Sequence, residues 1–430
     1  MAKNEDNFQP RLDFIRRLLR EKLGQEDEVK VVPVQYDPES PFKYNNFVYR
    51  ATLKAPKEGF LEPRQPGTVA IPAGTKDFIV RLANPDAEGM HPQTRVENEV
   101  ALISLAAEAL RARFPRVVPS IYGWGSAASG QGWILQELMP GEPVDEAFAS
   151  MDLSQKRHIF SQMAELLKAL QDFSLPDSIS GFGGVTFAAD GSGRIVSTAM
   201  STVGAGPWSS YQQSFEGRLL VALRKADDNP YIRGWHANGI RKRLDAFVRD
   251  ISRQLQSLES AEEKCIVHAD FTTNNLLFDP VTQRITGFID WDFSSVLHPS
   301  YEFLRSFDGA GGQFRGWSGD EEDNEQAALR HAKLNGFPSP LPESTRGEDG
   351  GVDWELAKAW EDELERLDVK RPRTIVGIES VADVDTILRS ILPWRVSNSD
   401  ILRLQSEEVI MKCRDENEQH LDGLLQRLGF

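Results

Sequence analysis

The chain has 430 residues, of which 40% are hydrophobic and 27% are charged, values that are ordinary for a globular protein with room for two or three domains. Its formal net charge of -16 excludes the broad basic surface on which nucleic-acid-binding proteins depend, although a local cationic cleft is compatible with it. The two cysteines, Cys265 and Cys413, cannot form a disulfide framework, and Cys265 is expected to be a buried, reduced thiol. No apolar run approaches the ~18 residues of a membrane span, and the first residues lack the apolar core of a signal peptide. We therefore expect a cytoplasmic protein with no membrane span and no nucleic-acid partner.

The N-terminal part of the chain predicts one helix followed by strands. Residues 11–23 carry leucine and isoleucine on one helical face and arginine on the other. This pattern favours an amphipathic helix that packs on its own domain, with a membrane surface as the less favoured alternative. Residues 29–36 and 47–53 alternate as strands, and residues 56–75, rich in Pro and Gly, indicate a long hairpin insertion.

An apolar strand over residues 77–83 contains Arg81, and a helix is predicted to follow over residues 93–112. The apolar stripe predicted for this helix consists of Val96, Val100, Ile103, Ala107 and Leu110. Two carboxylates, Glu97 and Glu99, lie near the start of the helix, and either one could face the strand.

The middle of the chain changes from strands to helices. The predicted elements are strands over residues 117–124 and 132–139, helices over residues 153–173, 212–225 and 239–258, and a glycine-rich hairpin over residues 181–193. Trp208 and Tyr211 could line a substrate wall, but packing in the core or at a helix start is the favoured interpretation.

The most informative stretch runs over residues 266–278 and is completed by residues 288–291. It predicts a short strand, a polar loop and a hairpin, with four polar side chains at strand ends: His268, Asp270, Asn275 and Asp290. An Asp and an Asn five residues apart, with a second Asp from the next hairpin, can converge on one point, and such hard oxygen ligands suit Mg2+ held together with phosphates. The spacing His-x-Asp-x-x-x-x-Asn followed by an Asp is that of a phosphoryl-transfer catalytic loop. The less favoured alternative is a buried histidine with carboxylates that only satisfy turn amides.

The segments His-Ala-Asp-Phe-Thr-Thr-Asn-Asn and Ile-Asp-Trp-Asp resemble the aminoglycoside phosphotransferase and choline kinase branch of the protein-kinase-like fold, especially its long fungal members. The resemblance covers about residues 29–305. It implies an α+β fold of two lobes, with a small antiparallel sheet and one key helix in the first lobe and a larger, mainly helical second lobe. The implied domains are an N-terminal helix over residues 1–28, a nucleotide-binding lobe over 29–140, a lobe with the catalytic and metal loops over 141–305, and a helical extension over 306–430 that packs on it.

The same resemblance implies roles for the polar residues of the catalytic stretch. Asp270 would orient the acceptor hydroxyl and take its proton, and His268 would lock the loop through hydrogen bonds. Asn275 and Asp290 would hold Mg2+, while the role of Asp292 stays open.

For the nucleotide, the resemblance implies a second set of residues: Arg81, Glu99, Asn46, Glu137 and Met139. Arg81 stands where kinases place a phosphate-gripping lysine, and Glu99 would orient it, with Glu97 as a rival. The loop that covers the phosphates lacks glycine, but Asn46 resembles an Asn found there in this branch. Backbone groups near Glu137 and Met139 would bind the purine ring of ATP, and GTP is not excluded.

After Asp292, Glu302 resembles an acidic residue that braces the catalytic loop in bacterial relatives, and we interpret it as structural. The remaining predictions are an acidic, solvated run over residues 318–325, a Pro/Gly/Ser-rich linker over 338–351, and helices over 354–367, 381–392 and 400–428.

We therefore predict an enzyme: an ATP-dependent phosphotransferase that moves the γ-phosphate to a hydroxyl of a small molecule with Mg2+. One alternative is a degenerate kinase that binds nucleotide or a partner without turnover, since the glycines are missing and Arg81 replaces lysine. A second is a metal-dependent hydrolase with His268, Asp270, Asp290 and Asp292 as ligands. The sequence identifies neither the acceptor nor the oligomeric state. An aminoglycoside acceptor would require a strongly acidic pocket for its ammonium groups.

Overall fold

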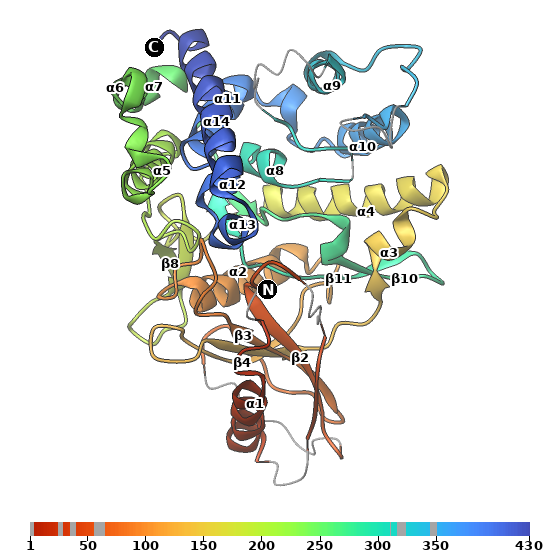
Figure 1. Cartoon of the computed structure of the whole chain (residues 1–430). Coiled ribbons are helices and arrows are strands. Elements are labelled where there is room, and N and C mark those ends of the chain that lie inside the picture. Colours follow the sequence, from red (N-terminus) through yellow and green to blue (C-terminus); the bar gives the residue numbers. More distant parts are fainter. Residues whose placement is uncertain are drawn as a thin grey trace.

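The structure is a computed structural model that describes residues 4–24, 29–34, 40–55, 65–309, 311–315, 324–344 and 351–430. It has the predicted α+β architecture, with a small antiparallel sheet in one lobe and a larger helical lobe (Figure 1). Parts of several predictions lie outside the described residues: 1–3 and 25–28 of the N-terminal helix segment, 35–36 of the first strand, 56–64 of the insertion, 318–323 of the acidic run and 345–350 of the linker.

The small lobe is built on a five-stranded antiparallel sheet in the order β1-β2-β3-β5-β4. Its strands are β1 (Lys30–Pro33), β2 (Asn46–Thr52), β3 (Asp77–Ala83), β4 (Ile121–Gly125) and β5 (Trp133–Glu137). Helix α1 (Phe8–Leu23) covers one face, where Ile15 and Leu19 pack with Phe78 and Leu135. The predicted amphipathic helix therefore packs on its own domain, because its leucines match the apolar face of the sheet.

Helix α2 (Arg95–Leu110) lies between the sheet and the helices of the larger lobe (Figure 1). Ile134, which alternates with Leu135 along β5, belongs to the same core cluster as α2, on the other side of the sheet. The predicted stripe was wrong at Ala107, which is exposed. The helix buries Leu102 and Leu105 as well, because both lobes pack against it.

The connection between the lobes pairs with the hairpin formed by β10 (Leu276–Asp279) and β11 (Arg284–Phe288). Its strand β6 (Glu142–Pro143) pairs with β10. The Thr286 hydroxyl donates to the Pro140 carbonyl at 2.6 Å. At Gly141 (φ 111°), a Cβ would clash with the backbone of Phe278 at 2.8 Å, so a glycine is required where the two segments meet. A short ladder of β9 (Cys265–Val267) with β12 (Ser295–Leu297) supports the loop between them.

The larger lobe is mainly helical. Its elements up to residue 305 are α3 (Val144–Phe148), α4 (Leu153–Asp172), the hairpin β7 (Gly184–Phe187) and β8 (Ile195–Thr198), α5 (Tyr211–Asp228), η1 (Arg233–Trp235), η2 (Ala237–Gly239), α6 (Ile240–Arg249), α7 (Ile251–Gln254), η3 (Thr273–Asn275) and α8 (Ser300–Arg305). The continuous helix predicted over 239–258 was wrong, because the helical conformation is interrupted at Asp250 (φ −99°, ψ 11°).

Tyr211 is fully buried and its hydroxyl lies 3.2 Å from Ser300 Oγ, so it packs in the core. Cys265 is buried and free, as predicted.

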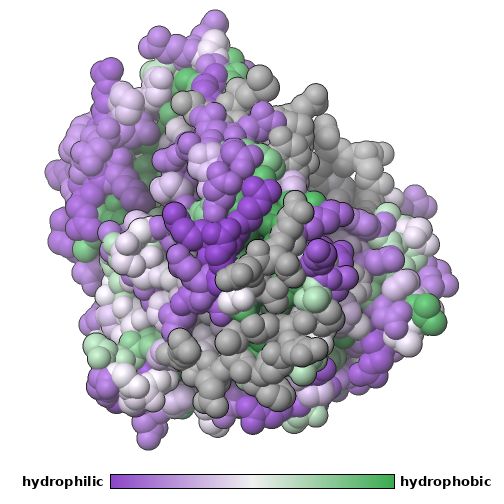
Figure 2. Space-filling model, turned by 90° about the horizontal axis from the view of Figure 1, so that it is seen from below, coloured by the Kyte–Doolittle hydropathy of each residue, from purple (hydrophilic) through white to green (hydrophobic). Residues whose placement is uncertain are grey.

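The C-terminal segment adds further helices to the larger lobe (Figure 1). They are α9 (Asn324–Asn335), α10 (Trp354–Arg366), η4 (Pro372–Thr374), α11 (Ile378–Ile391), α12 (Trp394–Ser397), α13 (Ser399–Leu404) and α14 (Glu407–Arg427). The single helix predicted over 400–428 was wrong, because α13 ends at Leu404 and Ser406 caps a new helix, α14, by accepting a hydrogen bond from Val409 N–H. None of the described helices combines the length and apolarity needed to cross a membrane. From below, hydrophilic residues cover much of the coloured surface (Figure 2).

Candidate active site

The loop between β9 and η3, which the sequence predicted to be catalytic, is held by one buried carboxylate. Glu302, on α8, accepts hydrogen bonds from the backbone N–H groups of His268 (2.8 Å) and Ala269 (2.9 Å). The Ser306 hydroxyl also donates to Glu302, and Ser306 Oγ accepts from Phe271 N–H at 2.8 Å. Ala269 has a positive φ of 64°, a conformation that a non-glycine residue keeps only when its surroundings hold it. Glu302 therefore acts as the structural brace that the sequence suggested.

His268 joins the catalytic loop to the segment that carries Asp290. Its ring is fully buried and stacks on Phe288, with centroids 4.4 Å apart. Nε2 lies 3.0 Å from the Ile289 carbonyl oxygen, to which its N–H can donate, and Nδ1 accepts from Asp270 N–H at 3.3 Å. Burial lowers the pKa of His268 to about 3, so the ring is neutral near pH 7. Because both ring nitrogens are engaged and the ring is inaccessible, His268 does not fit the ligand set of the hydrolase alternative.

Asn275 fixes the orientation of Asp270. Its Nδ2 donates both to the Asp270 backbone carbonyl and to Asp270 Oδ2, at 2.8 Å each. The amide oxygen of Asn275 is therefore turned away from Asp270 and is the atom that can face a cation. Desolvation raises the pKa of Asp270, while the Asn275 hydrogen bond opposes the shift. Ile289 N–H donates to the Asn275 carbonyl at 3.0 Å, which places the residue before Asp290 beside Asn275.

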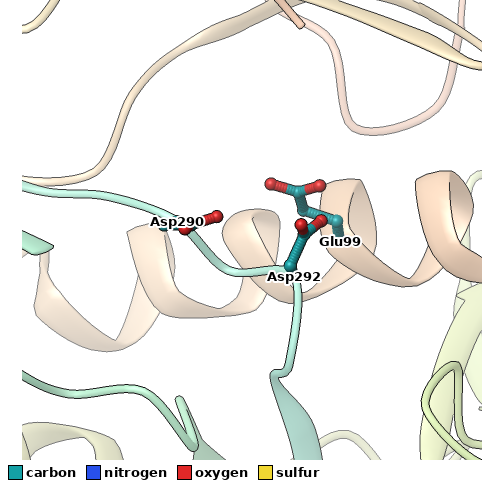
Figure 3. Close-up of side chains that lie close together, drawn as sticks. All are labelled: Glu99, Asp290 and Asp292. Carbon is teal, nitrogen blue, oxygen red and sulfur yellow. The ribbon is translucent and has the colours of Figure 1, made fainter. Parts of the chain in front are cut away.

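Three carboxylates gather beside α2, as Figure 3 shows. Glu99 comes from α2, and Asp290 and Asp292 come from the loop after β11; an oxygen of each lies within 4.8 Å of the others. Asp290 has a positive φ of 62°, which Asp tolerates better than most residues. Desolvation by the surrounding protein raises the pKa of Asp290 to about 6, with Arg81 opposing the shift and Asp292 adding to it.

Arg81, on β3, is the cation of this cluster. It forms a buried ion pair with Glu99 and further ion pairs with Asp290 at 2.9 Å and Asp292 at 3.5 Å. Its partner on α2 is Glu99 and not Glu97. Glu97 Oε2 is buried without a hydrogen-bond partner among the described residues. The guanidinium thus bridges the sheet, α2 and the loop after β11 in one contact.

Asp292 and Arg95 complete the cluster, and the sequence assigned neither. Asp292 is buried, accepts a 2.5 Å hydrogen bond from Asn46 Nδ2 and lies 3.7 Å from Arg95. Arg95 also donates to Asn46 Oδ1 at 3.2 Å, so the Asn46 side chain is held between these two charges. Arg95 precedes Glu99 by four residues and thus shares its helical face, a signal from which it could have been found.

The segment predicted to bind the purine ring lies at the end of β5. The Glu137 side chain accepts from Arg116 at 3.0 Å and from Ser120 N–H at 3.2 Å. Its backbone N–H donates to the Ser120 carbonyl at 2.9 Å. Met139 is buried two residues later, in the connection between the lobes. The Glu137 carboxylate is therefore engaged by hydrogen bonds within the protein. A ligand at this segment would have to bind to its backbone groups.

The donor set at the cleft fits a divalent cation. The Asp290 side chain is 41% exposed although Arg81 contacts it, and Asn275 belongs to the neighbouring segment, joined to Ile289 by a backbone hydrogen bond. Carboxylate and amide oxygens are the ligands that Mg2+ takes in proteins. Carboxylates this close to one another repel, and a cation would relieve that repulsion.

Comparison with solved structures shows the same fold at low sequence identity. The ADP-bound aminoglycoside phosphotransferase APH(2'')-Ib is 12% identical, with 96% of this chain and 98% of that chain covered and a TM-score of 0.50. The streptomycin–ATP ternary complex of APH(2")-IIa is 13% identical, with 96% and 95% covered and a TM-score of 0.49.

Sequence comparison gives the family. No curated protein matches the chain significantly. The sequence model of the phosphotransferase enzyme family, however, matches residues 67–347, well over half of the chain. This match includes Arg81, Glu99 and the complete catalytic loop. The chain therefore belongs to the phosphotransferase enzyme family.

Proposed function

We propose that the chain is a Mg2+-dependent kinase that transfers the γ-phosphate of ATP to a hydroxyl of a small molecule. The observation that carries the proposal is the pairing of a fixed Asp270 with the cluster of Arg81, Glu99 and Asp290. In such reactions, positioning and charge neutralisation provide most of the catalysis.

In this proposal Asp270 orients the acceptor hydroxyl and accepts its proton as the new P–O bond forms. Asn275 keeps the Asp270 carboxylate in place through Nδ2, and its amide oxygen would hold Mg2+ together with Asp290. When bound, Mg2+ would neutralise charge on the nucleotide phosphates. His268 is a positioning residue, because it is neutral and ties the loop to Ile289.

The nucleotide would lie between the lobes in this proposal. Arg81, oriented by Glu99, would contact the phosphates, and Asn46 would support that region through Asp292. Backbone groups between Glu137 and Met139 would bind the purine ring, which leaves ATP and GTP to be distinguished by experiment. We further propose that residues 29–140 form the nucleotide lobe, that 141–305 carry the catalytic and metal loops, and that 306–430 cover the acceptor side. The proposed location is the cytoplasm.

The test combines nucleotide binding with ADP release. We expect Mg2+-ATP or Mg2+-GTP to raise the thermal unfolding midpoint of the protein, since a ligand stabilises the state that binds it. Asp290→Asn should lose this magnesium-dependent shift. Asp270→Asn should keep it but lower acceptor-dependent ADP release by about 100-fold or more. Asp177→Asn, at an exposed position, is the matched control.

Two outcomes would contradict the proposal. The absence of any shift with Mg2+-nucleotide in folded wild-type protein would remove the kinase assignment. A shift in Asp290→Asn as large as in the wild type would remove the metal role. Binding without any turnover would favour the degenerate kinase.

A further inference from the structure

A cavity of about 410 Å³ opens beside Asp270, on the side of the larger lobe. Its walls come from the catalytic loop, α5, α8 and α11, and the residues that matter here are Arg218, Lys225, Tyr301, Arg305, Leu388 and Asp270 itself. Because Asp270 is the proposed base, this cavity is where an acceptor would lie.

Arg218 is the most unusual residue of the cavity wall. It is only 4% exposed, and its Nε donates to the Ser214 carbonyl at 3.2 Å. Both terminal nitrogens, Nη1 and Nη2, are buried and meet no hydrogen-bond acceptor among the described residues. The guanidinium stacks on Phe215 at 4.1 Å and lies 5.1 Å from the Tyr301 ring centroid. A buried guanidinium without a counter-ion is costly, and its two free donors form the fork that a carboxylate or phosphate accepts.

The other charges of the cavity do not neutralise Arg218. Arg305 forms an ion pair with Asp385 at 3.0 Å, and the same carboxylate lies 3.1 Å from Arg389, so one anion serves two cations. Lys225 is exposed, and no ion pair is present for it among the described residues. Asp270 is the only acidic residue in the part of the wall that the structure describes. That part of the wall therefore carries three cations and one anion in a protein whose net charge is -16.

We infer that the acceptor is a small hydroxyl compound with an anionic group, a carboxylate or a phosphate, which Arg218 binds in a fork while the hydroxyl faces Asp270. This inference rests on the proposed function and adds the chemical class of the acceptor. Lys225 attracts the anion at the mouth of the cavity, and Leu388 contacts the carbon skeleton. The described wall of this cavity lacks the strongly acidic lining that a polycationic aminoglycoside would need, and the three cations in it oppose such a substrate.

The test measures binding of matched probes to the full chain with Mg2+-ADP at constant ionic strength. The probes are glycerate for a carboxylate, glycerol 3-phosphate for a phosphate, glycerol as the neutral compound and kanamycin as the polycation. We expect an anionic probe to raise the unfolding midpoint more than glycerol does, and the stronger of the two identifies the anion. Arg218→Met, which keeps the length of the side chain, should weaken that probe about tenfold to a hundredfold. Arg224→Met, at an exposed position on the same helix, should leave it unchanged.

Three outcomes would overturn the inference: neither anion binds better than glycerol, kanamycin is the best probe, or Arg218→Met binds the anion as tightly as the wild type. If Arg218→Met does not fold, Lys225→Met at the exposed mouth replaces it, with an expected loss of about threefold; an unchanged affinity there overturns the inference as well. The proposed function fails separately, in the Mg2+-ATP binding assay, which needs no acceptor. If the protein binds an anionic probe but no nucleotide, the anion site is supported and the proposed kinase activity is contradicted.

Discussion

Replacing Glu302 by glutamine is expected to change how the stability of the protein depends on pH. The Glu302 side chain is 1% exposed, and it accepts two backbone N–H groups and one hydroxyl. Burial raises the pKa of Glu302 from 4.5 to about 7, and these hydrogen bonds oppose the shift. Burial of Glu302 therefore costs folding free energy only when the carboxylate is charged.

The size and sign of this cost follow from the two pKa values. A change from 4.5 to about 7 corresponds to about 3 kcal/mol. Because the folded state binds the proton more tightly, this stability is fully present below pH 4.5 and is lost as the pH rises through about 7. Of the total, about 2 kcal/mol is lost between pH 5.5 and pH 8.5.

The glutamine side chain introduced by E302Q would be neutral at every pH and would lack this dependence. Its NH2 group must face the N–H of either His268 or Ala269, which leaves one buried donor unsatisfied at a cost of about 1–3 kcal/mol. We therefore expect E302Q to be less stable than the wild type by about 1–3 kcal/mol at pH 5.5. The difference should be about 2 kcal/mol smaller at pH 8.5.

Urea unfolding of both proteins at pH 5.5 and pH 8.5 measures the stability difference and its change with pH. All other titrating groups are common to the two proteins, so their contributions cancel. Glu216→Gln, at an exposed position on α5, is the control and should behave like the wild type. A loss of stability in E302Q that is equal at pH 5.5 and pH 8.5, or larger at pH 8.5, would refute the reasoning.

Two further predictions concern the C-terminal segment. Gly377→Ala should destabilise the protein by about 3 kcal/mol or more in urea unfolding, because Gly377 has a φ of 87° and a Cβ would lie 2.3 Å from the Ser257 carbonyl oxygen. Gly423→Ala, within α14, where a Cβ would meet the Arg427 guanidinium at an ordinary contact distance of 3.6 Å, should instead be neutral or stabilising, and equal losses in both variants would contradict the prediction. Asp400→Asn should raise the Kd of Mg2+-ATP about threefold to tenfold in calorimetry, because Asp400 accepts from the Lys43 backbone N–H at 2.8 Å and so fixes the segment before β2. An unchanged Kd would show that this contact does not support the nucleotide loop.

The sequence predicted the catalytic loop well because its signal is local. The spacing of His268, Asp270 and Asn275 places them on one loop in any fold that has this strand, loop and hairpin. Helix ends were less predictable. Apolar periodicity continues across Asp250 and across Ser406, so it cannot reveal where the backbone leaves the helix.

Contacts between distant segments could not be derived from the sequence. The choice of Glu99 over Glu97 depends on how α2 is rotated against β3, and a helix turns by about 100° per residue. Two residues along the helix therefore separate a carboxylate that meets Arg81 from one that does not. The role of Asp292 has the same origin, because its partners Asn46 and Arg95 come from β2 and α2.

The cationic cavity is the extreme case of this limit, and the proposed substrate class depends on it. In the sequence, nothing distinguishes Arg218, Lys225 and Arg305 from other charged residues on predicted helices. A net charge of -16 even suggests that cations should bind. Charge acts on a substrate only over about a Debye length, roughly 8–10 Å in physiological salt, so the few groups at the cavity wall outweigh the distant acidic surface. The folded structure identifies these groups, because it shows which of them are buried. The two terminal nitrogens of Arg218, which meet no acceptor among the described residues, can be recognised only once α5 and α8 are packed together. If the proposed kinase activity is correct, net charge is a poor guide to the acceptor. A buried guanidinium that meets no partner among the described residues is a more specific one.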